Sequence, residues 1–447
     1  MHSSQPRASL HTLGCRLNQA ESAVLAGQLK RKGYQLVEPG QPTDLLVVNT
    51  CSVTAQAEKE CRVIVRKTLR HSPNAFVAVT GCYAQTGMQA LQQVPGIDLI
   101  VGNQYKMTLP EHLPVGTVLP KRSTALVLHT KRIDHEEFVL PGTGDCGSTR
   151  APLKIQDGCN VMCSFCLIPF ARGRERSRHV DDVVREANEL VQQGHREMVL
   201  TGVNIGRYNS QQCDLVDLIQ RLEQIDGLER IRISSIEPTT ISERLLDHMA
   251  SSSKLCPFLH IPLQSGSDVV LQTMNRQYTA AEYRALIEKA ALRIPSLGLG
   301  ADVMVGFPGE GDNEFGATLQ LVKELPFSYL HVFTFSKRPG TAAARLRQVV
   351  PSSITKARAM SLAELSRTKR LAFYRQYLDQ PVRVLFERSE REGFATGRTG
   401  NFMKVEVPTA EDLWNSFGKV VITGVMDGLA MGHLTPSTSP TRELALV

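Results

Sequence analysis

Three cysteines lie close together in the stretch CNVMCSFC, where Cys159, Cys163 and Cys166 have the spacing Cys-x3-Cys-x2-Cys. A [4Fe–4S] cluster has four irons that each take one outer ligand, and four cysteines complete it. Three cysteines leave one iron open to a substrate or cofactor, much as a catalytic zinc keeps one open position. Gly158 permits a sharp turn directly before the triplet. The spacing therefore favours a cluster that does chemistry at an open iron.

Zinc and inert buried thiols are the two alternatives for this triplet. Zinc loops commonly carry Cys-x2-Cys pairs with two further ligands, and no fourth cysteine lies close to this triplet. Free cysteines are often simply buried. The combination of Gly158, Phe165 and a following basic segment argues against that interpretation.

Three further cysteines each end a predicted strand near the N-terminus. Cys15, Cys51 and Cys82 occur in TLGCRLNQAES, VVNTCSVT and VTGCYAQ. Apolar strands alternate with amphipathic helices from residue 8 to about 120, which predicts a parallel α/β sheet. The carboxyl ends of parallel strands form one rim, so these three cysteines are expected to converge there. Three buried cysteines without a ligand are the alternative.

The rest of the chain divides into segments of different character. Residues 1–120 are predicted to form the N-terminal domain, and 121–150 a linker or irregular entry strand. Strands and helices alternate again over 151–378, with polar or glycine-rich tails on the strands, which predicts a whole or partial β/α barrel. Its last part, 341–378, is expected to be helical. Short alternating strands over 379–433 predict a small antiparallel barrel, and 434–447 a disordered tail.

The bulk composition is that of a globular protein. The chain has 447 residues, a hydrophobic fraction of 42% and a formal net charge of +7. No apolar run approaches the roughly 18 residues that a membrane helix needs, and the start lacks the apolar core of a signal peptide. We therefore expect a cytoplasmic protein, in which patterned cysteines more often bind metal or act in catalysis than form disulfides.

The triplet, with aromatic Phe165 before its last cysteine, resembles the signature of radical S-adenosylmethionine (SAM) enzymes. The resemblance implies that Cys159, Cys163 and Cys166 ligate a [4Fe–4S] cluster whose open iron chelates SAM. One electron from the reduced cluster then cleaves the sulfonium to a 5′-deoxyadenosyl radical. No Glu follows Gly202, where such enzymes often carry a Gly-Glu pair. The expected cofactor-binding residues lie at the triplet and at strand ends of the predicted barrel: Phe165, Gly202, Asn204, Ser234, Glu237, Gly306 and Gly309.

The three N-terminal motifs resemble the first domain of methylthiotransferases, and the C-terminal segment resembles a TRAM domain. This resemblance covers nearly the whole chain. It implies that Cys15, Cys51 and Cys82 hold a second, auxiliary [4Fe–4S] cluster that carries the sulfur to be methylated and inserted. The implied cofactors are two [4Fe–4S] clusters and SAM. Four cysteines receive no role: Cys61, Cys146, Cys213 and Cys256.

Several segments are most similar to the threonylcarbamoyladenosine (MtaB-like) branch of that family, among them NTCSVTAQAEKECR, IPFARGRERSR and FTFSKRPGTAAAR. The implied reaction converts N6-threonylcarbamoyladenosine at tRNA position 37 to its 2-methylthio derivative. Methylthiolation of isopentenyladenosine in tRNA or of a ribosomal-protein aspartate is the alternative, and an iron–sulfur RNA-binding protein without turnover a more distant one. The implied partners are tRNA, a reductant such as flavodoxin or ferredoxin and an unidentified sulfur donor, with no membrane.

The distribution of charge independently favours an RNA partner. Residues 337–375 contain ten Lys and Arg against the single acid Glu364, and a run of one sign more often meets phosphate than a mixed one. A second basic cluster follows the triplet, and could instead pair with nearby acids. The candidate RNA contacts are Arg172, Arg174, Arg176, Lys337, Arg338, Arg367, Lys369 and Arg370. The C-terminal segment is not basic, and its Phe386, Phe394 and Phe402 could stack on bases or fill a core.

Overall fold

A parallel sheet forms the N-terminal domain of the computed structural model, which describes residues 5–114, 119–133, 138, 140 and 147–435. The strand order is β2-β1-β3-β4-β5-β6, and all neighbours are parallel. Every residue of β3 and β4 is buried, because helices cover both faces of the sheet. The strands are β1 (Arg7–Thr12), β2 (Gln35–Val37), β3 (Leu45–Thr50), β4 (Phe76–Gly81), β5 (Leu99–Val101) and β6 (Leu126–Leu128).

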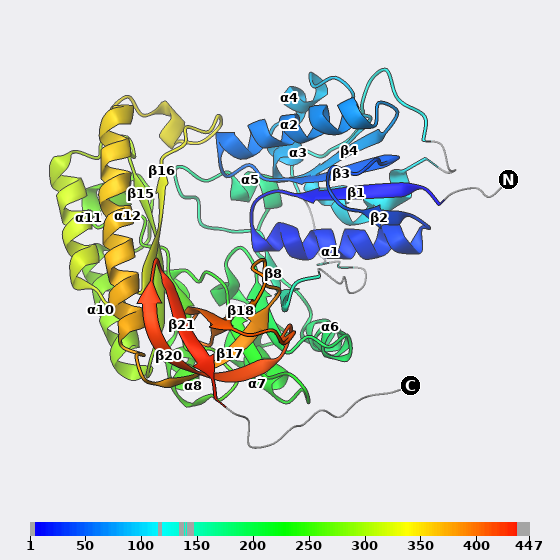
Figure 1. Cartoon of the computed structure of the whole chain (residues 1–447). Coiled ribbons are helices and arrows are strands. Elements are labelled where there is room, and N and C mark those ends of the chain that lie inside the picture. The colour runs from blue at the N-terminus through cyan, green and yellow to red at the C-terminus, as the bar shows by residue number, and fades with distance from the viewer. Residues whose placement is uncertain (1–4, 115–118, 134–137, 139, 141–146, 436–447) are drawn as a thin grey trace.

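Two helical layers enclose this sheet (Figure 1). Leu25 and Leu29 of α1 (Arg16–Arg31) pack on one face together with Leu109 of η1 (Asn103–His112). The other face is covered by α2 (Ala55–His71) and α4 (Met88–Gln92), and the short helix α3 (Cys82–Thr86) begins directly at the end of β4.

Six parallel strands form the central barrel, which is open between its first and last strands. The order is β7-β10-β13 and β14-β15-β16, joined by bridges from Ile231 to Leu255 and from Ser235 to His260. Six helices pack outside the strands and enclose the largest apolar core. The strands are β7 (Arg150–Lys154), β10 (Glu197–Thr201), β13 (Arg230–Ile233), β14 (Phe258–His260), β15 (Gly298–Val305) and β16 (Tyr329–Thr334); the helices are α6 (Val180–Gln192), α7 (Leu215–Glu223), α8 (Glu243–Ser251), α10 (Ala280–Arg293), α11 (Asp312–Glu324) and α12 (Ser352–Arg375).

Short elements occupy the loops of this barrel. They are β8 (Gln156–Asp157), α5 (Ile168–Arg172), β9 (Arg176–Ser177), η2 (Ile205–Arg207), β11 (Asn209–Ser210), β12 (Cys213–Asp214), η3 (Pro238–Thr240), α9 (Asp268–Thr273) and η4 (Ala343–Arg345). None of the helices in the described part of the chain has the length and apolar character needed to cross a bilayer.

A closed five-stranded barrel of order β17-β18-β19-β21-β20 follows α12. It lies against the central barrel, and the N-terminal domain sits on the other side of the junction (Figure 1). Phe386 is fully buried in its core, so this ring is not available to stack on RNA bases. The strands are β17 (Pro381–Glu387), β18 (Phe394–Thr399), β19 (Lys404–Pro408), β20 (Phe417–Met426) and β21 (Leu429–Leu434).

The predicted fold class is confirmed: a parallel α/β sheet, a partial β/α barrel and a small β-barrel. Three predicted boundaries were wrong. Residues 126–128, in the segment expected to be a linker or an irregular entry strand, extend the N-terminal sheet as β6. Helix α1 begins at Arg16, directly after Cys15, whereas the sequence pattern predicts a helix only from Ala20 to Lys32. The helix expected from residue 341 begins only after Pro351, because proline supplies no N–H to an upstream turn and suits a helix start. Most of the predicted tail, 436–447, and Cys146 lie outside the described residues.

Candidate active site

The loop between β8 and α5 brings Cys159, Cys163 and Cys166 together as free thiols. Backbone N–H groups point at two of the sulfurs: Val161 N lies 3.4 Å from Cys159 Sγ, and Ile168 N lies 3.4 Å from Cys166 Sγ. Gly158 has φ +71°, and a Cβ there would lie 1.9 Å from the carbonyl oxygen of Arg174. Only glycine fits that close approach, as the sequence predicted.

Residues 274, 275 and 307 of the central barrel hold this loop in place. Ser164 N donates to the carbonyl of Met274 at 2.9 Å, and Asn275 Nδ2 donates to the carbonyl of Met162 at 2.8 Å. The Phe165 ring packs edge-on against Phe307, with ring centroids 6.4 Å apart. The loop is therefore held by residues that follow α9 and β15 as well as by its own turn.

Arg276 contacts the triplet directly, and sequence reasoning missed it. Its Nη1 lies 3.2 Å from Cys163 Sγ, and its Nη2 pairs with the Glu237 carboxylate. Glu237, a predicted cofactor residue, is thus engaged by a buried cation rather than being a free surface acid. A lone arginine in MNRQY gives no sequence signal of this contact, because its two partners lie far away in the chain.

The thiols of the triplet are well suited to a metal. Burial raises the pKa of Cys159 to about 11 and that of Cys166 to about 12. Neutral thiols are therefore favoured in the bare protein, and bound iron would supply the positive charge that stabilises thiolates. The sulfur donor set, the inward N–H groups and the Arg276 contact together fit a cluster that takes three cysteine ligands.

The predicted residues at the ends of β10 and β13 lie beside the triplet loop. Asn204 is 1% exposed, and neither of its side-chain polar atoms has a hydrogen-bond partner within the described structure. Its backbone N donates to Gln156 Oε1 at 2.7 Å, just before the triplet. Gly202 packs on the same Gln156 side chain, and Ser234 N bonds to the carbonyl of Leu200. An orphaned buried amide at this rim fits a polar ligand such as SAM.

Packing within the protein explains the two glycines of GFPGE, residues 306–310. A Cβ on Gly306, at φ +75°, would lie 2.5 Å from Thr355 Oγ1 of α12, and Gly309 N donates to the carbonyl of Gln348 at 2.9 Å. Glu310 also pairs with Arg358 at 2.6 Å. The close approach of residues 348–358 accounts for these glycines, so their cofactor contact stays a prediction.

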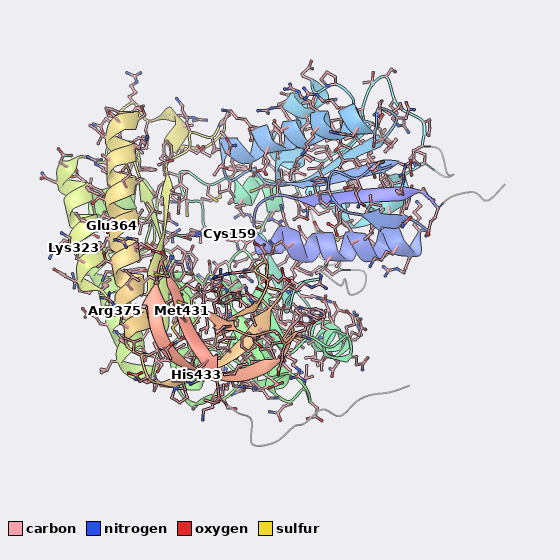
Figure 2. The ribbon with its side chains drawn as sticks, viewed as in Figure 1. Cys159, Lys323, Glu364, Arg375, Met431 and His433 are labelled. Carbon is pink, nitrogen blue, oxygen red and sulfur yellow. The ribbon has the colours of Figure 1, made fainter. Side chains whose placement is uncertain are left out.

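The three N-terminal cysteines follow β1, β3 and β4, which are neighbours in the sheet. Gly14 lies so close to Cys51 that a Cβ would be 2.6 Å from its sulfur. Val53 N lies 3.4 Å from Cys51 Sγ. Asn103 Nδ2 lies 3.7 Å from Cys82 Sγ and donates to the carbonyl of Ala171, in α5, at 2.6 Å. This asparagine therefore joins the N-terminal cysteines to the helix that follows the triplet, at the junction where Figure 2 shows Cys159.

A buried charge network ties the two domains together beside these cysteines. Glu21 of α1 accepts from Lys106 at 2.6 Å, from Lys154 at 2.6 Å and from Arg172 at 2.8 Å. Arg172 and Lys154 also contact Asp157 at 3.1 and 2.8 Å. Although burial opposes ionisation, the three cations hold the pKa of Glu21 well below its ordinary value.

Most of the predicted RNA contacts interact with other groups of the protein itself, two of them as buried side chains. The prediction for Arg172 was wrong, because its side chain is 2% exposed within the network. Arg338 is also buried and pairs with Glu58, which contradicts its predicted role. Four of the remaining six contact other residues: Arg176 pairs with Asp157, Arg367 pairs with Glu364, Lys369 donates to carbonyls at the end of α11, and Arg370 lies over Tyr329. The other two, Arg174 and Lys337, are exposed. Glu364, which Figure 2 labels, is an exposed residue of α12.

Comparisons with known proteins match both cysteine-bearing domains. Residues 7–102 match a family described as uncharacterized protein family UPF0004, and residues 153–322 match the radical SAM superfamily. A threonylcarbamoyladenosine tRNA methylthiotransferase MtaB of Bacillus subtilis is 37% identical over 421 residues, 93% of each chain. This chain belongs to the radical SAM methylthiotransferase family. It is therefore a radical SAM enzyme, and the family implies a [4Fe–4S] cluster and SAM as cofactors.

Other relatives of this methylthiotransferase chain carry two different names. The MtaB of Aquifex aeolicus is 36% identical and covers 85% of this chain and 92% of its own. A tRNA-2-methylthio-N(6)-dimethylallyladenosine synthase of Clostridium tetani is 32% identical over 92% of each chain. Among solved structures, the radical SAM methyltransferase TsrM of Kitasatospora setae has a TM-score of 0.55 at 16% identity, covers 76% of this chain and 77% of its own, and shows likeness of fold.

Proposed function

We propose that this chain converts N6-threonylcarbamoyladenosine at position 37 of tRNA to its 2-methylthio derivative. The supporting observation is that the arrangement of the cysteines and the names of the most similar relatives point to the same reaction. Asn103 links Cys82 to the helix that follows the triplet, and the relatives named for threonylcarbamoyladenosine align over 85–93% of this chain at 33–37% identity. A tRNA substrate is consistent with a cytoplasmic location, which we propose with it.

The N-terminal cysteines, in this proposal, hold a second [4Fe–4S] cluster. Cys15, Cys51 and Cys82 end three neighbouring strands, and N–H groups from Val53 and Asn103 point at two of the sulfurs. Such N–H···S contacts commonly support iron–sulfur ligands. The matching contacts on both groups are the support for two clusters rather than one.

The protein's own residues position the reacting partners. When bound, the triplet cluster and SAM supply one-electron cleavage of the sulfonium. Arg276 orients Cys163 and holds Glu237, and the orphaned Asn204 amide offers a donor and an acceptor to SAM. Arg174 and Lys337 stay exposed and are proposed to contact the RNA backbone. A reductant such as flavodoxin or ferredoxin and a sulfur donor complete the proposed partners.

Iron content tests the proposed clusters. Anaerobically reconstituted wild-type protein should bind about eight irons per chain, and Cys15→Ala about four, because each [4Fe–4S] cluster contributes four. Cys61→Ala is the matched control, since Cys61 is a buried residue within α2 and does not follow a strand; it should keep about eight. Four irons in the wild type would refute the second cluster.

Nucleoside mass spectrometry tests the substrate. Deletion of the gene should remove 2-methylthio-N6-threonylcarbamoyladenosine from tRNA and leave N6-threonylcarbamoyladenosine. The intact gene should restore the product, and the Cys159→Ala form should not. Loss of the 2-methylthio derivative of dimethylallyladenosine instead would assign the chain to the other named activity.

A further inference from the structure

Three arginines from two domains surround one phenylalanine ring at the domain junction. Arg150 of β7, Arg232 of β13 and Arg398 of β18 have their guanidinium carbons 5.5, 5.2 and 4.3 Å from the centre of the Phe402 ring. Phe402 reaches this place from the turn after β18, where it has φ +73°. The central and C-terminal barrels therefore gather positive charge at one point.

The N-terminal domain adds a fourth arginine from the opposite side. Arg16 directly follows Cys15, and both residues line a cavity of about 930 Å³ together with Arg150 and Glu387. All three domains thus contribute to this arginine cluster, defined as Arg16, Arg150, Arg232 and Arg398.

The cluster has more positive than negative charge. Including Arg230, five arginines meet two carboxylates. Glu197 contacts Arg232 at 2.7 Å and Arg230 at 3.6 Å. Glu387 contacts Arg150 at 2.6 Å and Arg398 at 3.7 Å. Uncompensated charge in a partly buried place is costly, so such an excess favours an anionic ligand.

The arginines differ in how far their donors are used. Arg230 and Arg232 donate to backbone carbonyls of the C-terminal barrel. In contrast, Arg150 Nη1 and Arg398 Nε are buried without a hydrogen-bond partner in the described part of the chain. The Arg16 guanidinium has no hydrogen bond or ion pair to any residue within the same described ranges. One arginine from each domain therefore has N–H donors without an acceptor. Leaving buried donors without an acceptor is unfavourable, and a bound anion would supply the acceptors.

We propose that Arg16, Arg150 and Arg398 bind the carboxylate of the N6-threonylcarbamoyl group. The inference rests on the proposed function, since that group is the only carboxylate on the substrate base. It must lie near the N-terminal cysteines while C2 reacts, and Arg16 is bonded to Cys15, with Cα atoms about 3.8 Å apart. Guanidinium groups match carboxylates in geometry as well as charge. A dimethylallyl group is uncharged and leaves these donors unsatisfied, so the three arginines would select between the two named substrates.

Binding of three anticodon stem-loops tests this assignment without turnover. The stem-loops carry N6-threonylcarbamoyladenosine, its methyl ester or unmodified adenosine, and reconstituted protein is used without reductant. The wild type should prefer the free carboxylate over the ester by roughly 10- to 100-fold, as expected for charge-assisted hydrogen bonds. Arg16→Gln should remove this preference, and Arg398→Gln, in another domain, should do the same. Arg16→Lys keeps the charge and should retain part of it.

Arg31→Gln is the matched control, because Arg31 is exposed at the other end of α1; it should bind all three stem-loops as the wild type does. If Arg16→Gln lowers the affinity for all three stem-loops by the same factor, the cluster binds backbone phosphate and the assignment is overturned. An intact preference in both Gln variants also overturns it. Failure of the proposed function is separate: in that case the reduced, SAM-loaded wild type does not methylthiolate the threonylcarbamoyl stem-loop.

Discussion

Replacing Glu21 by Gln should loosen the contact between α1 and the rest of the site. Both carboxylate oxygens accept from cations: Oε1 from Lys154 and Arg172, and Oε2 from Lys106 and Arg172. A glutamine keeps the shape, but its NH2 group must then face a cation. Lys154 and Arg172 retain Asp157, whereas Lys106, with a side chain 2% exposed, pairs only with Glu21 among the described residues. Breaking a buried ion pair leaves a buried charge without a partner. We therefore expect the free energy of local opening around α1 and η1 to fall by about 3–5 kcal/mol.

Hydrogen–deuterium exchange of peptides covering α1 and η1 measures this loss, because exchange reports the free energy of local opening. Glu60→Gln, an exposed residue of α2, is the control and should leave exchange unchanged. Adding Lys106→Met to Glu21→Gln should restore part of the protection, since the stranded ammonium is removed. A loss below about 1 kcal/mol, which is typical of surface pairs, or no recovery in the double variant would refute the reasoning.

Three further outcomes follow from other sites. Gly158→Ala should lose the triplet's iron and keep that of the N-terminal cysteines, because its Cβ would lie 1.9 Å from a carbonyl oxygen; Gly316→Ala, with open space around it, should keep both. The Asp302 carboxylate, which lies 3.5 Å from Nδ1 of His331, raises the pKa of this histidine above its ordinary 6.5. The stabilising contribution of His331 is therefore complete below pH 6.5 and lost as pH rises through the folded pKa. An NMR titration of its ring should show this raised midpoint, and Asp302→Asn should lower it. Phe386→Ala should destabilise the C-terminal barrel by about 3–5 kcal/mol in thermal unfolding; a change near zero would contradict its core position.

The sequence was sufficient where chemistry depends on local spacing or strand order. The cysteine triplet and its preceding glycine are neighbours in the chain, and Cys15, Cys51 and Cys82 each end an apolar strand of a recognisable parallel sheet. Strand ends on one rim must meet, so their convergence was predictable.

Contacts across domains were not predictable in the same way. Arg172 appeared in a basic cluster and was assigned to RNA, yet its partner Glu21 lies 151 residues away. The density of positive charge in a sequence does not show which carboxylates fold against it. The arginine cluster has the same cause, since Arg16, Arg150 and Arg398 belong to three domains and lie far apart in the chain, although Arg16 stands in the motif TLGCRLNQAES. The late start of α12 reflects Pro351, which precedes its first residue and keeps residues 341–350 out of the helix.

The guanidinium groups of Arg230 and Arg232 attach the C-terminal barrel through its main chain, at the carbonyls of residues 383 and 398–400. Main-chain acceptors are present whatever side chain stands at those positions. Substitution of the outward-facing side chains of that barrel therefore leaves these four hydrogen bonds in place. The main chain thus fixes where the barrel sits, while the side chains decide what its solvent-facing surface presents.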